Sequence, residues 1–242
     1  KVSKELFFDY AKDYIQSISH TDVITVDGVE RNPSKVKSLL RSLARNISST
    51  VSINTICNDI NIRGDEISEK TVRDYLNTLE KIFVIDNINA WSPKLRSKAT
   101  IRSSKKREFV DPSLAMASLG ATDKDLLKDF NTFGFMFESL CMRDLKIYSE
   151  SIDGEVYYYR DNNDLECDAI IHLDNGKWGA IEVKLGGNEA QDEAARNLLK
   201  IKNIVDENAM GSPSFLMILT GTKYAFKRED GVLVVPLGCL KD

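Results

Sequence analysis

Two carboxylates and a lysine follow one another in the second half of the sequence, as Asp168, Glu182 and Lys184. Carboxylate oxygens are ligands that Mg²⁺ prefers, and Mg²⁺ often takes only one or two of them, together with waters and a substrate phosphate. The cation would lower the pKa of a bound water, and Lys184 could orient that water or stabilise charge developing on phosphorus. The residue types therefore predict a metal site at Asp168 and Glu182, suited to phosphodiester hydrolysis.

The elements around these residues predict that all three side chains share one face of a sheet. The stretches LECDAIIHL and KWGAIEVKL flank Asp174-Asn175-Gly176 and predict a β-hairpin. Odd-numbered positions are apolar or small in both strands, so odd positions must pair with odd positions. A three-residue loop with Gly176 in a left-handed conformation gives that register, whereas a two-residue Asn175-Gly176 turn would bury the wrong face. Asp168 then faces Glu182.

The same register leaves an ordinary interpretation open. Glu166 faces Lys184 across the predicted hairpin, and the two would form a common cross-strand ion pair on a solvated strand face. The spacing of these residues along the sequence is compatible both with a metal site and with this structural ion pair.

A third carboxylate precedes the hairpin. The sequence TDKD at Thr122 predicts the capped start of one long helix. Glu138 lies at the margin of its apolar side, so we expect a carboxylate placed near the core. The residues on that side are Leu126, Phe130, Phe133, Phe137 and Leu140.

The first half of the sequence predicts three helices followed by two strands. A helix begins at Pro33-Ser34, and Ser52 and Ser68 are the N-caps of the next two. The hydrophobic period then changes to two in FVIDNINAW and in the KATIR region, with SPKLRS as the loop between them. This order predicts a winged helix. The residues expected to point inward are Val36, Leu39, Leu40, Leu43 and Ile47, then Ile53, Ile56, Cys57 and Ile60, then Val72, Tyr75, Leu76 and Leu79.

A winged helix can bind DNA through its third helix and its wing. We expect Arg73, Asn77 and Lys81 to make base or backbone contacts from the helix. The basic residues expected to contact phosphates from the wing and the segment after it are Lys94, Arg96, Lys98, Lys105, Lys106 and Arg107. Winged helices also dock onto proteins, and four acidic residues dilute the charge of the third helix, so a docking role is the alternative.

Composition limits the remaining classes of protein. The 242 residues are 42% hydrophobic and 29% charged with a net charge of −4, which predicts a folded protein rather than a disordered one. The sequence has neither a membrane-spanning apolar run nor a signal peptide, and its four separated cysteines favour a reducing cytosol, so we expect a soluble cytoplasmic protein without membrane association. His20 and His172 lack metal-ligand spacing and are interpreted as structural.

Two resemblances extend this interpretation. Glu138, Asp168, the strand IEVK and a helix from about Asn188 follow the order of the PD-(D/E)xK, or restriction-endonuclease-like, core, which runs αβββαβ. More narrowly, almost the whole chain resembles the C-terminal region of prokaryotic AAA-superfamily ATPases, catalogued as domain of unknown function 4143. The matching stretches are SLLRSLARNISSTVSINTICNDI, TVRDYLNTLEKIFVIDNINAW, SSKKREFVDPSLAMASLG, GFMFESL, YYYRDNNDLECDAII and AIEVKLG.

The resemblance implies an α+β protein of two domains. Residues 1–104 would form the winged-helix region with a preceding helix, and residues 105–242 a nuclease-like mixed sheet flanked by helices. Glu138, Asp168, Glu182 and Lys184 match the nuclease-core positions, although the first strand reads ECDAI where the family usually has EVDFV. A P-loop ATPase domain of the same polypeptide would lie upstream, since no GxxxxGK(S/T) pattern occurs here and the chain does not begin with methionine.

Three functional classes follow from these residues. The first is a DNA phosphodiesterase that depends on Mg²⁺ or Mn²⁺ and is guided by the winged helix. The second is a non-catalytic DNA-binding module of an ATPase, and the third is a regulatory or oligomerisation domain. Residues 111–242 hold 14 Lys+Arg against 23 Asp+Glu. This acidic second half opposes tight nonspecific DNA binding, because each neutralised phosphate needs a basic side chain.

Overall fold

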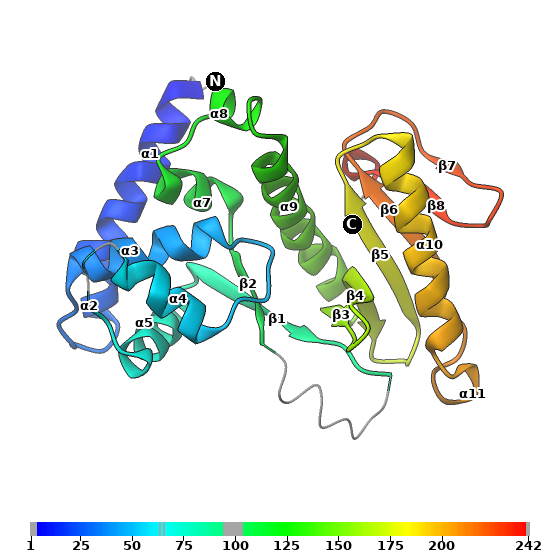
Figure 1. The fold of residues 1–242 in the computed structure, drawn as a ribbon, viewed down its shortest axis with the longest axis horizontal. Coiled ribbons are helices and arrows are strands. Elements are labelled where there is room, and N and C mark those ends of the chain that lie inside the picture. The colour runs from blue at the N-terminus through cyan, green and yellow to red at the C-terminus, as the bar shows by residue number, and fades with distance from the viewer. Residues whose placement is uncertain (1–3, 63, 65, 94–103, 241–242) are drawn as a thin grey trace. The chain divides into compact units, whose positions relative to one another are not determined.

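The computed structural model of the chain describes residues 4–62, 64, 66–93 and 104–240, and it separates into two compact units (Figure 1). The first unit comprises Lys1–Asn87 and Ser104–Ser139, and the second comprises Ile88–Ser103 and Leu140–Asp242. Each unit therefore combines two separate stretches of sequence. Helices occur together with parallel and antiparallel strand pairs, which confirms the expected mixed α+β class.

The first unit is mainly helical, and its core lies between the helices. Its elements are α1 (Lys4–Ser17), a π-helical turn (Ile18–Asp22), α2 (Val23–Thr25), α3 (Pro33–Arg45), α4 (Ile53–Asn61), α5 (Glu69–Lys81), the start of β1 (Ile85–Ala90), β2 (Lys106–Phe109), α7 (Pro112–Leu119), α8 (Asp123–Leu126) and the first half of α9 (Phe130–Glu150).

Local capping positions three of these helices as the sequence predicts. Asn32 caps α3, whose first residue is Pro33, by accepting a hydrogen bond from the amide of Ser34. The hydroxyls of Ser52 and Ser68 accept hydrogen bonds from the amides of Thr55 and Thr71 at the starts of α4 and α5. The predicted inward residues of all three helices are buried in the core.

The expected long helix from Thr122 is wrong, because it forms as two helices. The Thr122–Asp125 capping box is present, but α8 ends at Leu126. The carboxylate of Asp129 then accepts hydrogen bonds from the amide and hydroxyl of Thr132, which begins α9 as a separate helix. The break leaves Phe130 68% exposed instead of on an apolar side.

The predicted strand after α5 is confirmed as β1. The wing's KATIR strand and the loop residues Lys94, Arg96 and Lys98 lie outside the described residues. In the first unit β2 neighbours β1 in the strand order, and the amide of Val110 donates to the carbonyl of Val84 at 3.2 Å.

The second unit is built on a mixed sheet with the strand order β1-β3-β4-β5-β6-β8-β7, to which β1 contributes its last residues. β3 and β4 are antiparallel, as are β4 and β5, whereas β5, β6 and β8 are parallel to one another. The elements after α9 are β3 (Gly154–Arg160), β4 (Glu166–Leu173), β5 (Trp178–Lys184), α10 (Asn188–Ile204), α11 (Glu207–Met210), β6 (Phe215–Thr220), β7 (Phe226–Lys227), β8 (Leu233–Pro236) and a 3₁₀ turn (Leu237–Cys239).

The predicted hairpin register is confirmed. Ala169 pairs with Ile181 and His172 pairs with Trp178, so odd positions pair with odd positions. The amide of Leu173 donates to the carbonyl of Lys177, which closes a three-residue loop, and Gly176 has a φ of 82°. Continued by one pair beyond Ala169, this register places Asp168 opposite Glu182.

The structural alternative of an ordinary solvated strand face does not describe β5. Six consecutive residues of β5 are buried, including Glu182. The reason is that α10, which connects β5 to β6, packs over the face that carries the even-numbered residues. That part of the core contains Ile170, Trp178, Ala180, Ile218 and Val234 from the strands and Ala194, Ala195, Leu198 and Ile201 from α10.

Two further findings bear on the class of protein. No helix in the described part of the chain is both long enough and apolar enough to cross a lipid bilayer. All four cysteines are free thiols, three of them buried.

Candidate functional site

Asp168, Glu182 and Lys184 come together at one end of the β4–β5 pair. The Nζ of Lys184 lies 2.9 Å from Oε2 of Glu182 and 3.8 Å from Oδ2 of Asp168. Glu182 and Lys184 alternate along β5 and therefore share a face, and Asp168 joins them from β4 because of the register. The predicted convergence of these three side chains is thus observed.

Burial differs among the three side chains. The side chain of Glu182 is 4% exposed, whereas those of Asp168 and Lys184 are 19% and 31% exposed. A buried carboxylate is costly unless it is paired, and the ammonium of Lys184 supplies that pairing. The site therefore has a closed inner end at Glu182 and an outer end that solvent reaches.

A backbone hydrogen bond fixes the orientation of Asp168. Its Oδ2 accepts a hydrogen bond from the amide of Val183 at 2.7 Å. This bond joins the side chain of Asp168 on β4 to the backbone of β5 and holds the carboxylate toward β5. Asp168 is therefore positioned before any ligand arrives.

The neighbouring thiol does not provide a nucleophile. Cys167 is buried, and burial raises its pKa well above the ordinary value, as do the nearby charges of Glu182 and Asp168. Its Sγ lies 3.3 Å from the carbonyl oxygen of Ala169 and 3.2 Å from that of Ile181. A neutral, enclosed thiol is unreactive.

The donor set at the site fits a hard divalent cation in part. Asp168 and Glu182 supply oxygen ligands, and Mg²⁺ can be held by two carboxylates when waters and phosphate oxygens complete its coordination. Across the described ranges, no group of three or more His, Cys, Asp or Glu side chains is arranged to hold a metal ion. The residues suit a cation shared with a substrate rather than one enclosed by protein ligands alone.

Glu138 belongs to the first unit, in the first half of α9. Its carboxylate forms an ion pair with the ammonium of Lys106 on β2, and the two side chains are 14% and 6% exposed. Its grouping with Asp168 stays a prediction.

The basic residues expected to contact DNA have different environments. Arg73, Asn77 and Lys81 are exposed on α5, and Arg73 pairs with Glu69 at 3.1 Å. Lys105 is exposed as well. Lys106 is placed in its buried ion pair rather than for a phosphate contact, and this pair joins β2 to α9.

Arg107 is half-buried and donates a hydrogen bond to the carbonyl of Val51 at 3.0 Å. Burial lowers its pKa from the ordinary value. Of the basic run after the wing, Lys105 is thus the member most open to solvent.

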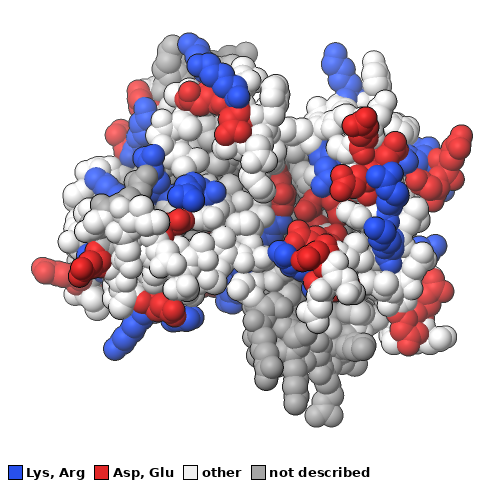
Figure 2. Space-filling model, in the orientation of Figure 1, with Lys and Arg blue, Asp and Glu red and all other residues white. Residues whose placement is uncertain are grey.

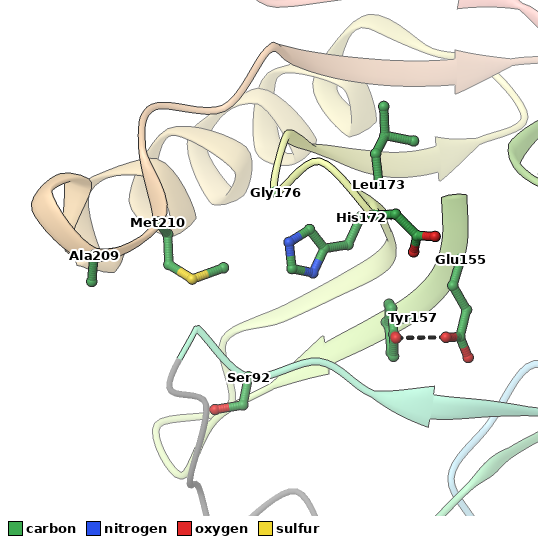
Figure 3. Close-up of a pocket in the computed structure, with 9 residues that line it drawn as sticks. Ser92, Glu155, Tyr157, His172, Leu173, Gly176, Ala209 and Met210 are labelled. Atoms are coloured by element: carbon green, nitrogen blue, oxygen red, sulfur yellow. Dashed lines mark hydrogen bonds between the residues drawn. The ribbon is translucent and has the colours of Figure 1, made fainter. Parts of the chain in front are cut away.

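A cavity of about 390 Å³ lies at the opposite end of β4, near the hairpin loop. Figure 3 shows the imidazole of His172 projecting into it, between Met210 on one side and Ser92 on another. His172 lies four residues along β4 from Asp168, or roughly 13 Å in an extended strand. The cavity is therefore separate from the carboxylate–lysine site.

Three polar side chains of the cavity already have hydrogen-bond partners, namely Glu155, Tyr157 and His172. The hydroxyl of Tyr157 donates to Oε2 of Glu155 at 2.6 Å, and burial together with that carboxylate raises the pKa of Tyr157 to about 12. The indole of Trp91 donates to Nδ1 of His172 at 3.5 Å. Sequence reasoning did not find this cavity, because its residues come from four distant stretches and share no motif.

Comparisons with known proteins agree with the division of the chain into two parts. Residues 2–125 match the family model described as Domain of unknown function (DUF8612), and residues 133–240 match the one described as Domain of unknown function (DUF4143). The predicted resemblance to the 4143 domain is therefore confirmed for the second part, while the matching stretches of the first part fall in a different family. No curated protein matches the chain.

Proposed function

This chain belongs to the family described as Domain of unknown function (DUF8612), and we propose that it is a DNA phosphodiesterase that depends on Mg²⁺ or Mn²⁺ and acts at Asp168, Glu182 and Lys184. One observation carries the proposal. The ammonium of Lys184 lies beside two carboxylates from adjacent strands, one of which is buried and the other held by a backbone amide.

The roles follow from the position of each side chain. Asp168 and Glu182 would hold the cation, which would lower the pKa of a bound water and offset the charge of a phosphate. Glu182 is the more enclosed ligand, and Asp168 is kept in orientation by the amide of Val183. Lys184 is partly exposed, so it can turn from its carboxylates to donate to an oxygen of a phosphate and stabilise the charge that develops there.

The remaining parts of the proposal rest on the resemblance to the PD-(D/E)xK core and to C-terminal regions of AAA-superfamily ATPases. Glu138 would complete the nuclease-like set, and the helices of the first part would act as a winged helix that presents Arg73, Asn77 and Lys81 to duplex DNA. An ATPase domain of the same polypeptide would be the partner, in the cytoplasm.

A non-catalytic module is the second candidate. It is favoured by the fact that Lys184 already pairs with both carboxylates, as it would in a purely structural ion-pair cluster. In that case the second unit would bind DNA or regulate the ATPase without turnover.

Cleavage and cation binding separate the two candidates. The full chain is incubated with supercoiled plasmid and single-stranded circular DNA in Mg²⁺, Mn²⁺ or EDTA, and Mn²⁺ binding is measured by calorimetry. Asp168→Ala should lose cation binding and cleavage together. Lys184→Ala should keep cation binding and slow cleavage by about 100-fold or more.

Lys177→Ala is the matched control, since this exposed lysine lies on the same hairpin. It should change neither quantity. A wild-type chain that neither binds Mn²⁺ nor cuts DNA, alone or joined to an ATPase domain, would leave the non-catalytic candidate.

A further inference from the structure

The segment between β6 and β8 combines aromatic and basic residues in a way that burial does not explain. Its sequence from Gly221 to Arg228 is GTKYAFKR. Tyr224 is 77% exposed and Phe226 is 50% exposed, and both lysines are exposed. Large aromatic side chains exposed as a pair, next to cations, indicate a binding surface more than a stabilising one.

We propose that Tyr224 and Phe226, with Lys223 and Lys227, bind unpaired nucleotides of a DNA strand that enters the carboxylate–lysine site. The inference rests on the proposed function and adds the form of the substrate. We call these four residues the aromatic–lysine edge.

Strand register connects this edge to the site. Glu182 pairs with Ile218 on β6, Ile218 pairs with Val234 on β8, and Val234 pairs with Phe226 on β7. Residues paired directly across neighbouring strands project from the same face, so Phe226 shares a face with Glu182. Three strand spacings separate them, which is about 14 Å. Ile218 and Val234, which lie between them, are buried beneath α10, so the way from the edge to the site runs along the end of the sheet and not across this face.

Tyr224 lies on the side of Phe226 that is nearer to Lys184. β7 runs antiparallel to β8, so the residues before Phe226 approach the level of Pro236. Pro236 pairs with Thr220, and Thr220 pairs with Lys184. A single DNA strand lying along this end of the sheet would therefore contact both Tyr224 and Lys184.

An ion pair holds the edge against the start of α10. Arg228 lies 2.8 Å from Asp192 on α10 and 3.1 Å from Asp230. α10 covers the face that carries Glu182, so the pair anchors β7 on that side. Figure 1 shows β7 at the margin of the sheet beside β8, and α10 packs against β5 and β6.

Charge favours a phosphate backbone as the occupant. Among the residues that the structure describes, neither Lys223 nor Lys227 forms an ion pair, so both charges face solvent. In Figure 2, Lys and Arg side chains stand among Asp and Glu on the side of the second unit that carries α10. Two unpaired cations near a site rich in carboxylates would offset the repulsion that a phosphate meets there.

Protection of an edge strand would explain the two lysines but not the two aromatic side chains. Lysines protect an edge strand from pairing with another chain, and β7 is both short and at the edge. Protection of an edge does not require Tyr224 and Phe226, which add exposed apolar area. Stacking on bases uses both properties, because the rings take the base faces and the lysines take the phosphates.

The occupant is unpaired rather than duplex DNA. The faces of bases inside a duplex are already stacked, so an aromatic side chain can cover a base only where the strand is single or frayed. A protein partner is the competing occupant, and the experiment is arranged to identify it.

Binding is measured by fluorescence anisotropy on the full chain in EDTA, with a 20-nucleotide oligo(dT) and a 20-base-pair duplex as probes. Tyr224→Ala with Phe226→Ala should weaken oligo(dT) binding by about tenfold or more and leave duplex binding within twofold. Lys223→Gln with Lys227→Gln should reduce the salt slope for oligo(dT) by about 1.4, since each phosphate contact contributes about 0.7.

Matched variants control for lost surface and lost charge. Phe7→Ala with Tyr10→Ala removes two exposed aromatics from α1, and Lys200→Gln with Lys202→Gln removes two exposed lysines from α10. Neither pair should change oligo(dT) binding by more than twofold. All replaced side chains are exposed, so circular dichroism should show folded protein in each case.

The result also separates this inference from the proposed function. Asp168→Ala should retain oligo(dT) binding, and the aromatic double variant should retain Mn²⁺ binding. A wild-type chain that binds oligo(dT) through the edge but never cleaves would overturn only the proposed function. Unchanged oligo(dT) affinity in the aromatic variant, an equal loss for duplex, or no binding by wild type would overturn the inference. A purified protein partner released by Tyr224→Ala while oligo(dT) affinity stays unchanged would assign the edge to docking.

Discussion

The two units each hold a lysine between carboxylates, yet the two clusters differ in how far solvent reaches them. In the first unit Lys106 pairs with Glu138, and Glu108 lies nearby at 4% exposure. In the second, Lys184 is 31% exposed while it pairs with Glu182 and Asp168. The same residue types can therefore form a closed internal cluster or an accessible site, and accessibility rather than composition distinguishes them.

The closed cluster contains a buried carboxylate with a raised pKa and, beside it, a residue with a strained backbone conformation. Burial raises the pKa of Glu108, and the charge of Lys106 opposes that effect only in part. The hydroxyl of Ser48, a non-glycine residue with a φ of 58°, lies 3.3 Å from Oε2 of Glu108. Asp168, by contrast, has a short bond to a backbone amide. We expect substitutions to affect stability in the first cluster and chemistry in the second.

The largest expected effect is at Asp168. Asp168→Asn keeps the size of the side chain and an oxygen for the amide of Val183, but it removes the charge that would bind a cation. Cation-dependent cleavage should fall by about 1000-fold, while the free energy of unfolding changes by less than about 1 kcal/mol. Plasmid nicking and urea denaturation measure the two quantities. A large loss of stability with unchanged cleavage would mean that Asp168 stabilises the fold and does not take part in the chemistry.

The next largest effect is at Lys106. Lys106→Met removes the ammonium that pairs with the largely buried carboxylate of Glu138, so we expect a loss of about 3 to 5 kcal/mol in the free energy of unfolding. Lys106→Met with Glu138→Met removes both charges and should lose clearly less. Urea denaturation of the single and double variants provides the test. Equal losses in the two variants would show that lost packing, rather than the lost ion pair, dominates.

A pH dependence should distinguish the closed cluster. The pKa of Glu108 is raised in the folded protein, so its protonated form is favoured there. Its contribution to stability is present below its ordinary pKa and is lost as the pH rises through the raised value. Glu108→Gln, which stays neutral near Lys106 and Glu138, should therefore stabilise the protein more at pH 8 than at pH 4. Denaturation at several pH values measures this difference, and a gain that shrinks with rising pH would contradict it.

The smallest expected effect concerns the exposed residues of α5. Arg73→Gln with Lys81→Gln should reduce the salt slope of duplex binding by about 2 if both contact phosphates, with little change in stability because the Arg73–Glu69 pair is exposed. Lys37→Gln with Arg41→Gln on α3 is the control of equal charge. An identical salt slope of duplex binding in both double variants would assign α5 to docking. Duplex binding would then not be a function of the first unit.

The sequence by itself determined features that depend on a few neighbouring residues. Ser52 and Ser68 mark the starts of α4 and α5, since a cap bonds to an amide three residues away. Gly176 and the alternation of apolar residues set the hairpin register, because a turn conformation and a period of two are local properties. That register was sufficient to bring Asp168 to Glu182.

Tertiary structure alone decided which residues far apart in sequence meet. Lys106 joins Glu138 because β2 packs near α9, and this turns a basic run into a buried ion pair. Glu182 is buried because α10 covers a second face of the sheet, which alternation on the hairpin did not indicate. Phe226 lies in line with Glu182 only through the parallel pairings of β5, β6 and β8. Such contacts depend on how whole elements pack, and the spacing of residues along the chain carries no information about that packing.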